Sequence, residues 1–588
     1  MHSIAYLRHL RAKVINSILL KKYRFAHLQL FVFTKLWETV DILAEMSHVR
    51  NPTQRTFFEV DQLLPLLPED DPYCGSFLFF SQTILPQLEK YRQDLEKMYN
   101  PNLGRPSVDP VRMLGLTMLQ YMQGVPDRQA ESNCKCDLRY KLALNLSLDK
   151  GLCDYSSLSR FRKNLSEAGL VDIGFSAVLK AMDEAGYLQG KTKTQRTDST
   201  HVLGVVKVMS DLECAREALR LALEALDKQV TGKRPELWDA LWERYIENKP
   251  DYRMDKSGLK RRYRQAGEDA FRLLTWYDSL GWPETNKPNA VKLLQRFLQE
   301  RFEVDSDGTV EEVKKLPAGT MRNPHEPDAQ RRTKDSNKNK RWDGSLVQVS
   351  ETVQDLPCEK GEPTPNVITA MLSQPASTTD NQSLPQVEED RQSHGVGQPE
   401  VEYVDTGYVT SEELSRFDKE GRVLKGSAPK SRDLKGRFNV EDFDIDVENR
   451  RATCPGGHVN SQCGRLEEAG TGKVSFRFEF SRKDCQDCPL NGKCLGKEQK
   501  HRTITVSEHH THLQRRRKEQ KTEAFKEDMK HRNGIEATIS ELVRGHGLRR
   551  SRYRGLKKTS LHCLMCGAVC NIKRWYARIT WENNLEAA

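Results

Sequence analysis

The chain has 588 residues and a formal net charge of +10, from 93 basic and 83 acidic side chains. This length predicts two to four domains, and no apolar run is long enough to cross a bilayer, which excludes a membrane-spanning class. Its fourteen cysteines favour reduced thiols in a cytoplasm over a secreted disulfide framework.

The N-terminal third is predicted to be helical. Residues 1–45 differ in composition from the rest of the chain and are interpreted either as an upstream extension or as a docked helix, with a more ordinary start at Met46. Apolar residues then recur at helical spacing behind the N-cap Asp109 and the first-turn Pro110. Residues 46–185 are therefore expected to form one helical domain.

A later part of this domain, YSSLSRFRKNL, puts an apolar stripe on one face and places Arg160 and Arg162 mostly elsewhere. Such a helix fits a DNA groove. A plain surface helix explains the same spacing equally well.

The next segment, TKTQRTDSTHVLGVV, predicts a first strand within residues 190–208. Asp198 stands near its middle. A carboxylate on a central strand is costly unless it is paired or binds a cation, so Asp198 is a candidate metal ligand.

Residues 209–340 are expected to form a helical insertion and then a basic connection. Ser210 and Glu213 form a capping box at its start. Its tryptophans are expected to pack the insertion, with stacking on nucleic-acid bases as the alternative; they are Trp238, Trp242, Trp276 and Trp282.

Residues 341–429 return to strands, in SLVQVSETV, NVITAMLSQ, VEYVDTGYV and RVLKGSA. Residues 374–399, between the second and third of these strands, are read as a loop and a short helix. Asp405 ends the third strand, just before Gly407. An acid in this position faces the open end of a sheet, where ligands gather.

Residues 430–510 carry two short cysteine clusters. Cys485 and Cys488 are spaced as CxxC, and Cys454 and Cys494 complete a set of four thiolates that suits structural zinc. Cys463 is a substitute ligand, and free buried cysteines are the alternative reading.

Residues 511–580 are predicted to begin with a long helix from Thr511 to Val543. Arg532 lies one turn before Glu536, so their side chains are neighbours. The cations beyond Val543 are candidates for phosphate contacts; they are Arg544, Arg549, Arg550, Arg552 and Arg554. The three cysteines of the final helix, Cys563, Cys566 and Cys570, are spaced for core packing.

Asp198, Asp405 and Glu536 thus lie on a first strand, at the end of a later strand, and on a helix. Three such carboxylates suit two metal ions about 3.5–4 Å apart acting on a phosphodiester. With 83 acids in the chain, residue types alone do not single these out.

The choice of these three acids rests on a family resemblance. DSTHV, YVDTGYV and HRNGIEATISELVRGHGLRRSRYRG resemble the three catalytic blocks of DDE transposases of bacterial insertion sequences, most closely the insertion-sequence 1182 family, related to the insertion-sequence-4-like group. The stretch DPVRMLGLTMLQYMQGVPDRQ resembles that family's helical N-terminal domain, and CPGG with CQDCPLNGKC resembles its cysteine-bearing insertion. The resemblance covers about residues 46–580.

The resemblance implies an α/β protein with a ribonuclease-H-like catalytic core, and Mg²⁺ or Mn²⁺ held by Asp198, Asp405 and Glu536. It also implies that Arg532 corresponds to the arginine that precedes the catalytic glutamate in this family. It further implies cutting and joining of double-stranded DNA at the element's terminal inverted repeats, by a homodimer or larger assembly in a bacterial cytoplasm, close to the nucleoid.

Two departures concern the last motif. The wider group tends to have a tyrosine where Met529 stands and a lysine near Val543, whereas Arg544 is the nearest cation here. A decayed copy that binds DNA without cutting, and a nuclease without strand joining, remain as rival interpretations.

Overall fold

The computed structural model describes residues 72–587, apart from 101–106, 150, 207–208, 231, 233, 249–252, 336–339, 355–361, 432–433, 435 and 497. The interpretations of residues 1–45 and of Met46 fall outside this part of the chain. Across the ranges given above, no helix combines the length and the apolar character that a bilayer crossing requires.

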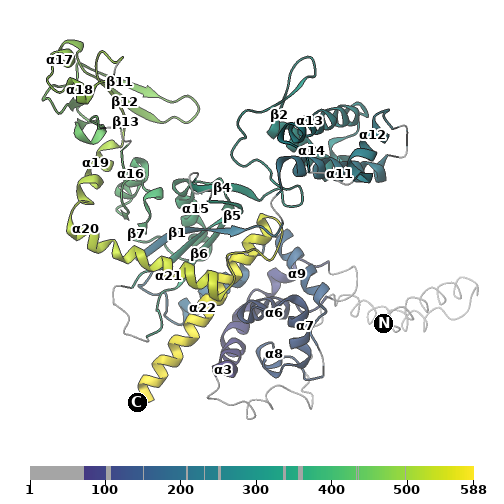
Figure 1. The fold of residues 1–588 in the computed structure, drawn as a ribbon. Helices are drawn as coiled ribbons and strands as arrows, with labels where there is room; N and C mark the ends of the chain where they lie inside the picture. Colours follow the sequence, from purple (N-terminus) through teal and green to yellow (C-terminus); the bar gives the residue numbers. More distant parts are fainter. Residues whose placement is uncertain are drawn as a thin grey trace, which may run out of the picture.

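A mixed six-stranded sheet forms the centre of the molecule (Figure 1). Its strands are β1 (Thr194–Leu203), β4 (Gln330–Asp335), β5 (Lys340–Thr352), β6 (Ile368–Pro375), β7 (Val401–Val404) and β8 (Val423–Lys425). They follow the order β4-β5-β1-β7-β8, and β6 also pairs with β5. β5 is antiparallel to β1, β4 and β6, whereas β7 and β8 run parallel to β1. The strands expected from the sequence are confirmed, and the chain is a mixed α/β protein.

β1 is a central strand, paired with β5 on one side and β7 on the other. Because side chains alternate along a strand, Arg196 and Asp198 contact helix α21 (Lys530–Gly545) on one face. Gln195 lies on the other face, where it accepts hydrogen bonds from β5, β6 and helix α15 (Asp380–Ser393). This alternation places the candidate acid toward α21.

The α21 face of the sheet contributes to the main apolar core. Helix α22 (Leu556–Ala587) packs there with the N-terminal helices in one continuous core that includes Val347, Val349 and Met371. The helical prediction for the N-terminal third is confirmed from residue 72 onward. These helices are α3 (Pro72–Phe79), α4 (Leu85–Glu89), α5 (Arg92–Glu96), α6 (Pro110–Gln123), α7 (Asp127–Cys136), α8 (Leu138–Ala143), α9 (Tyr155–Glu167) and α10 (Ile173–Glu184), with the π-helical turn η3 (Phe80–Ile84).

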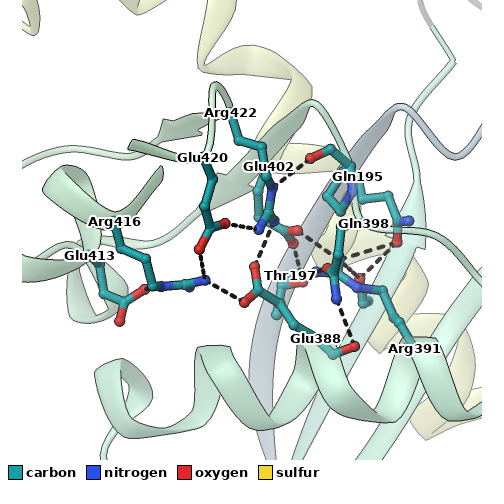
Figure 2. A network of polar contacts seen from close by, with 12 residues as sticks. Gln195, Thr197, Glu388, Arg391, Gln398, Glu402, Glu413, Arg416, Glu420 and Arg422 are labelled. Atoms are coloured by element: carbon teal, nitrogen blue, oxygen red, sulfur yellow. Dashed lines mark hydrogen bonds and ion pairs between the residues drawn. The ribbon is translucent and has the colours of Figure 1, made fainter. Parts of the chain in front are cut away.

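The α15 face is polar. Arg391 of α15 and Glu402 of β7 form a fully buried ion pair with a 2.6 Å contact, inside a wider network of hydrogen bonds (Figure 2). The loop and the helix expected over residues 374–399 are both present, but the helix is not short: α15 has 14 residues and begins with a capping box between Thr379 and Gln382. Its polar composition reflects the polar sheet face that it covers.

The helical insertion between β1 and β4 forms a lobe with a core of its own (Figure 1). Trp238 is buried in that core, and the other three tryptophans pack against it, so the packing interpretation is confirmed. The elements of this lobe are α11 (Asp211–Gln229), α12 (Trp238–Trp242), the π-helical turn η4 (Glu243–Glu247), α13 (Lys256–Ser279), η5 (Glu284–Asn286), α14 (Asn289–Arg301), β2 (Phe302–Val304) and β3 (Val310–Glu312).

Helix α16 (Ser411–Lys419) lies between β7 and β8, and after β8 the chain enters a small cysteine-rich lobe. This lobe contains η7 (Val440–Asp442), β9 (Asp444–Asp446), β10 (Arg451–Thr453), β11 (Gln462–Glu467), β12 (Val474–Glu479), α17 (Arg482–Gln486), α18 (Asn491–Cys494) and β13 (Thr503–Ser507). The long helix expected from Thr511 to Val543 is instead three: α19 (His510–Glu519), α20 (Glu523–Asp528) and α21. Thr522 caps α20 by accepting a hydrogen bond from the Phe525 amide, which starts a new helix after a break.

Candidate active site

Asp198 projects from β1 toward α21. Its carboxylate accepts hydrogen bonds from the Ser199 amide at 2.7 Å and from Nη2 of Arg532 at 3.0 Å. Burial raises the pKa of Asp198; the Ser199 amide and Arg532 lower it, and the nearby Asp405 and Asp380 carboxylates raise it again, leaving it above the usual value. A cation at this position would therefore stabilise the ionised form.

Asp405 comes directly after β7, the parallel neighbour of β1. Thr197 pairs with Val404, so Asp198 and Asp405 stand just beyond the last matched pair of the two strands. Asp405 is exposed and caps the short η6 helix (Thr406–Tyr408) by accepting a hydrogen bond from the Thr406 amide at 2.8 Å. This bond engages one carboxylate oxygen, while the side chain as a whole stays exposed.

Arg532 joins these two acids to Glu536. Its Nη2 lies 3.0 Å from an oxygen of Asp198 and 3.8 Å from one of Asp405, and its Nη1 lies 3.3 Å from an oxygen of Glu536. The structure thus brings the three acids, which lie far apart in the sequence, around one guanidinium group.

A buried charge cluster holds α21 against the sheet. Glu351 of β5 is fully buried and accepts hydrogen bonds from Arg196 at 2.7 Å, Thr538 at 2.7 Å and Arg574 at 3.1 Å. Arg196 also donates to the His531 carbonyl at 2.7 Å. A Cβ at Gly534 would overlap the Arg196 guanidinium. The glycine that weakens the helix therefore allows its close approach to β1.

Asp380 is a further acid near the site that the sequence did not single out. It begins α15 on the opposite side of the sheet, and Ser199 donates a hydrogen bond to it at 3.2 Å. A Cβ at Gly407 would lie 2.6 Å from one of its oxygens. Asp380 thus packs against the turn that carries Asp405. The polar composition of its segment favours a loop, which conceals this acid in the sequence.

The predicted cationic side chains other than Arg532 divide into two groups. Arg544, Arg550, Arg554 and Arg160 are exposed. The other three make hydrogen bonds within the protein: Arg549 to the His201 carbonyl, Arg552 to the Val125 carbonyl, and Arg162 to Asp127.

Arg162 corrects the sequence interpretation. Its side chain is 5% exposed, with an ion pair of 2.5 Å to Asp127, and it stacks over the Tyr553 ring. The buried face of α9 is wider than the spacing of its apolar residues indicated, because α22 and the residues around Tyr553 pack against it. This guanidinium is buried among protein groups.

The four predicted cysteines line one cavity in the cysteine-rich lobe. Cys454, Cys485, Cys488 and Cys494 surround it together with His458 and Asp484, and all four are free thiols. Burial raises the pKa of Cys485 and of Cys494, and the neighbouring cysteines raise both further. Four thiols that line one cavity are a donor set that fits zinc. Cys463 lies on β11 and does not line this cavity.

A second group of candidate ligand atoms, more closely spaced than the cysteines, lies outside the cysteine-rich lobe. In the part of the chain that the structure describes, Glu541, His546 and Cys570 alone place three candidate ligand atoms within 4.8 Å of one another. However, Arg574 donates two hydrogen bonds to Glu541, at 2.6 and 3.1 Å, and burial lowers the pKa of His546 to about 4. This group ties α21 to α22. Cys563, Cys566 and Cys570 are fully buried, which confirms their role in core packing.

The donor set around Arg532 also fits a divalent cation. Carboxylate oxygens are the ligands that Mg²⁺ and Mn²⁺ prefer, and here three of them already surround one positive charge. Asp198, Asp405 and Glu536 would hold the ion, and Arg532 would lie beside it.

Two family models match the chain. Residues 62–164 match a transposase domain (DUF772), and residues 453–576 match a transposase DDE domain. The second match contains Glu536 but neither Asp198 nor Asp405. No curated protein and no solved structure matches the chain. The chain therefore contains transposase domains, and a DDE domain implies a ribonuclease-H-like core, a divalent metal and DNA as a partner.

Proposed function

We propose that this chain is a DDE transposase of the insertion-sequence 1182 family. It cuts double-stranded DNA at the terminal inverted repeats of its element and joins the 3′ ends to target DNA. The observation that carries the proposal is the meeting of Asp198, Asp405 and Glu536 around Arg532. The sheet is mixed, and β5 lies between β1 and β6 and runs antiparallel to both. This arrangement supports the ribonuclease-H-like core.

The three acids have different tasks. Asp198, on a central strand and largely buried, fixes the position of the site. Asp405 and Glu536 are 55% and 67% exposed, so they complete the ligand set from the open side, where DNA enters. Bound Mg²⁺ would polarise the scissile phosphate and lower the pKa of the attacking water or 3′-hydroxyl. The guanidinium of Arg532 donates to a non-bridging phosphate oxygen once it leaves one carboxylate.

Three exposed arginines lie in the last turn of α21 and in the segment that follows it. They are Arg544, Arg550 and Arg554, and we expect them to contact phosphates near the cut. Because two element ends are joined in one reaction, we propose a homodimer or a larger assembly on DNA, working in the bacterial cytoplasm at the nucleoid.

The test is a cleavage assay with duplexes that carry the element's own ends. With Mg²⁺ or Mn²⁺ we expect cuts at the repeat termini and, with added target DNA, joined 3′ ends. With EDTA in place of the metal, the cuts are expected to vanish. Salt-dependent DNA binding without cuts in any metal would favour a decayed copy, and cuts without joining would favour a nuclease.

The cysteine cavity carries a separate prediction. We propose that Cys454, Cys485, Cys488 and Cys494 hold one structural Zn²⁺, and metal analysis of purified protein is expected to find about one zinc per chain. Cys488→Ser is expected to lose that zinc and lower the melting temperature, because metal binding contributes to folding. Cys463→Ser, outside the cavity, is the matched control. A zinc-free protein whose thiols all titrate would contradict the prediction.

A further inference from the structure

The helical insertion contains a cavity that the proposed active site does not use. It has a volume of about 580 Å³ and opens between α11, η4 and α13. Four arginines and one acid, Glu243, are among its lining residues. The arginines are Arg216, Arg244, Arg261 and Arg262.

Two of the four arginines are held in place by the insertion itself. Arg216 donates to the carbonyls of Arg244 and Asn248 at 2.9 and 3.2 Å and lies over the Tyr245 ring. Arg244 pairs with buried Asp269. The two carbonyl acceptors of Arg216 are neutral groups. Arg261 and Arg262 stand exposed on the first turns of α13, on the other wall of the cavity.

The positive charge continues outside the cavity along α13. Lys256, Lys260 and Arg264 are exposed and succeed one another at a spacing of four residues, so they share a face of the helix. The helix rises about 12 Å from Lys256 to Arg264, and over that length one DNA strand carries about three or four phosphates. A free anion would need only the cavity, whereas an extended row of charges matches a polyanion.

We propose that this cavity and the adjoining face of α13 bind the phosphate backbone of DNA, as a second DNA-contacting surface apart from the acids and the arginines after α21. The inference rests on the proposed function, because it takes DNA as the partner. Guanidinium groups bind phosphate oxygens in a two-pronged geometry. No base-reading geometry is involved, so the contact is independent of DNA sequence.

The experiment measures DNA affinity against salt concentration for the full chain and for Arg261→Gln/Arg262→Gln. Each lost phosphate contact reduces the slope of log affinity against log salt by about 1, so the slope is expected to fall by about 2. The fall should be the same on an element-end duplex and on an unrelated duplex of equal length. Arg261→Lys/Arg262→Lys should keep the slope, because it keeps the charge.

The matched control is Lys314→Gln/Lys315→Gln, which removes the same charge from two exposed lysines of the insertion that do not line the cavity. Its slope should match that of the unchanged protein, and melting temperatures of all variants should agree. An unchanged slope in the arginine variant, or a change on element ends alone, overturns the proposal. The proposal is also overturned if inorganic phosphate raises the melting temperature of the unchanged protein and of the other variants but not that of the arginine variant, while the DNA slope of the arginine variant stays unchanged. If the slope falls although the wild-type protein makes no cuts, the proposed function fails and the DNA surface stands.

Discussion

Glu536→Gln is expected to lower metal-dependent strand cleavage by at least about 100-fold while leaving DNA affinity within a few-fold of its original value. The substitution keeps the shape of the side chain and removes the charge that a cation needs. Glu536 is exposed and its carboxylate pairs with Arg532 at 3.3 Å, so the fold should not change. Cleavage rates at element ends with Mg²⁺, together with a binding curve, measure both quantities.

Asp198→Asn and Asp405→Asn should give the same separation of cleavage from binding, because the three acids surround one charge. Glu527→Gln is the matched control. Glu527 lies on the neighbouring α20, is exposed, and pairs with the exposed Lys530 at 2.6 Å, so its loss should leave cleavage unchanged. Near-normal cleavage by the Glu536 variant would remove the acids from the reaction.

The strands were predictable because their signals are local, and similar local signals made the three acids candidates before the family resemblance selected them. The strand pattern around Asp198 depends on neighbours a few residues away. The same is true of Asp405, which lies between a short strand and a glycine turn. The spacing of Arg532 and Glu536 depends only on helix geometry. That all three segments meet required the family resemblance, since no local pattern reports that Asp198 and Glu536 both lie against Arg532.

The features that were missed depend on tertiary contacts. Glu351 reads as an ordinary acid at the end of a strand, yet it is fully buried because Arg196 and Arg574 reach it from β1 and α22. Arg162 reads as a surface cation, yet Asp127 and Tyr553 enclose it. In each case the partner lies on another element, and spacing along one helix or strand carries no record of it.

Arg391→Met is expected to produce the largest loss of stability among single changes in the core. Arg391 and Glu402 are both fully buried. Removing the arginine leaves an unpaired buried carboxylate, which costs about 3–5 kcal/mol. The Arg391 guanidinium also donates to Ser350 at 3.1 Å, and Thr197 donates to Glu402 at 2.6 Å (Figure 2), so the loss would spread across β1, β5 and β7.

The comparison is thermal or denaturant unfolding of this variant beside Lys193→Met. Lys193 and Glu400 form an ion pair of 2.9 Å between the residues that precede β1 and β7, but both are about two-thirds exposed. Solvent screens such a pair, so its removal should hardly move the unfolding transition. Arg391→Met/Glu402→Gln should recover part of the lost stability, because no charge is then buried alone. Equal effects of Arg391→Met and Lys193→Met would show that burial does not set the strength of the pair.

Because Asp405 lies three residues beyond Glu402 on the same segment, Arg391→Met should also weaken cleavage at temperatures where the protein is still folded.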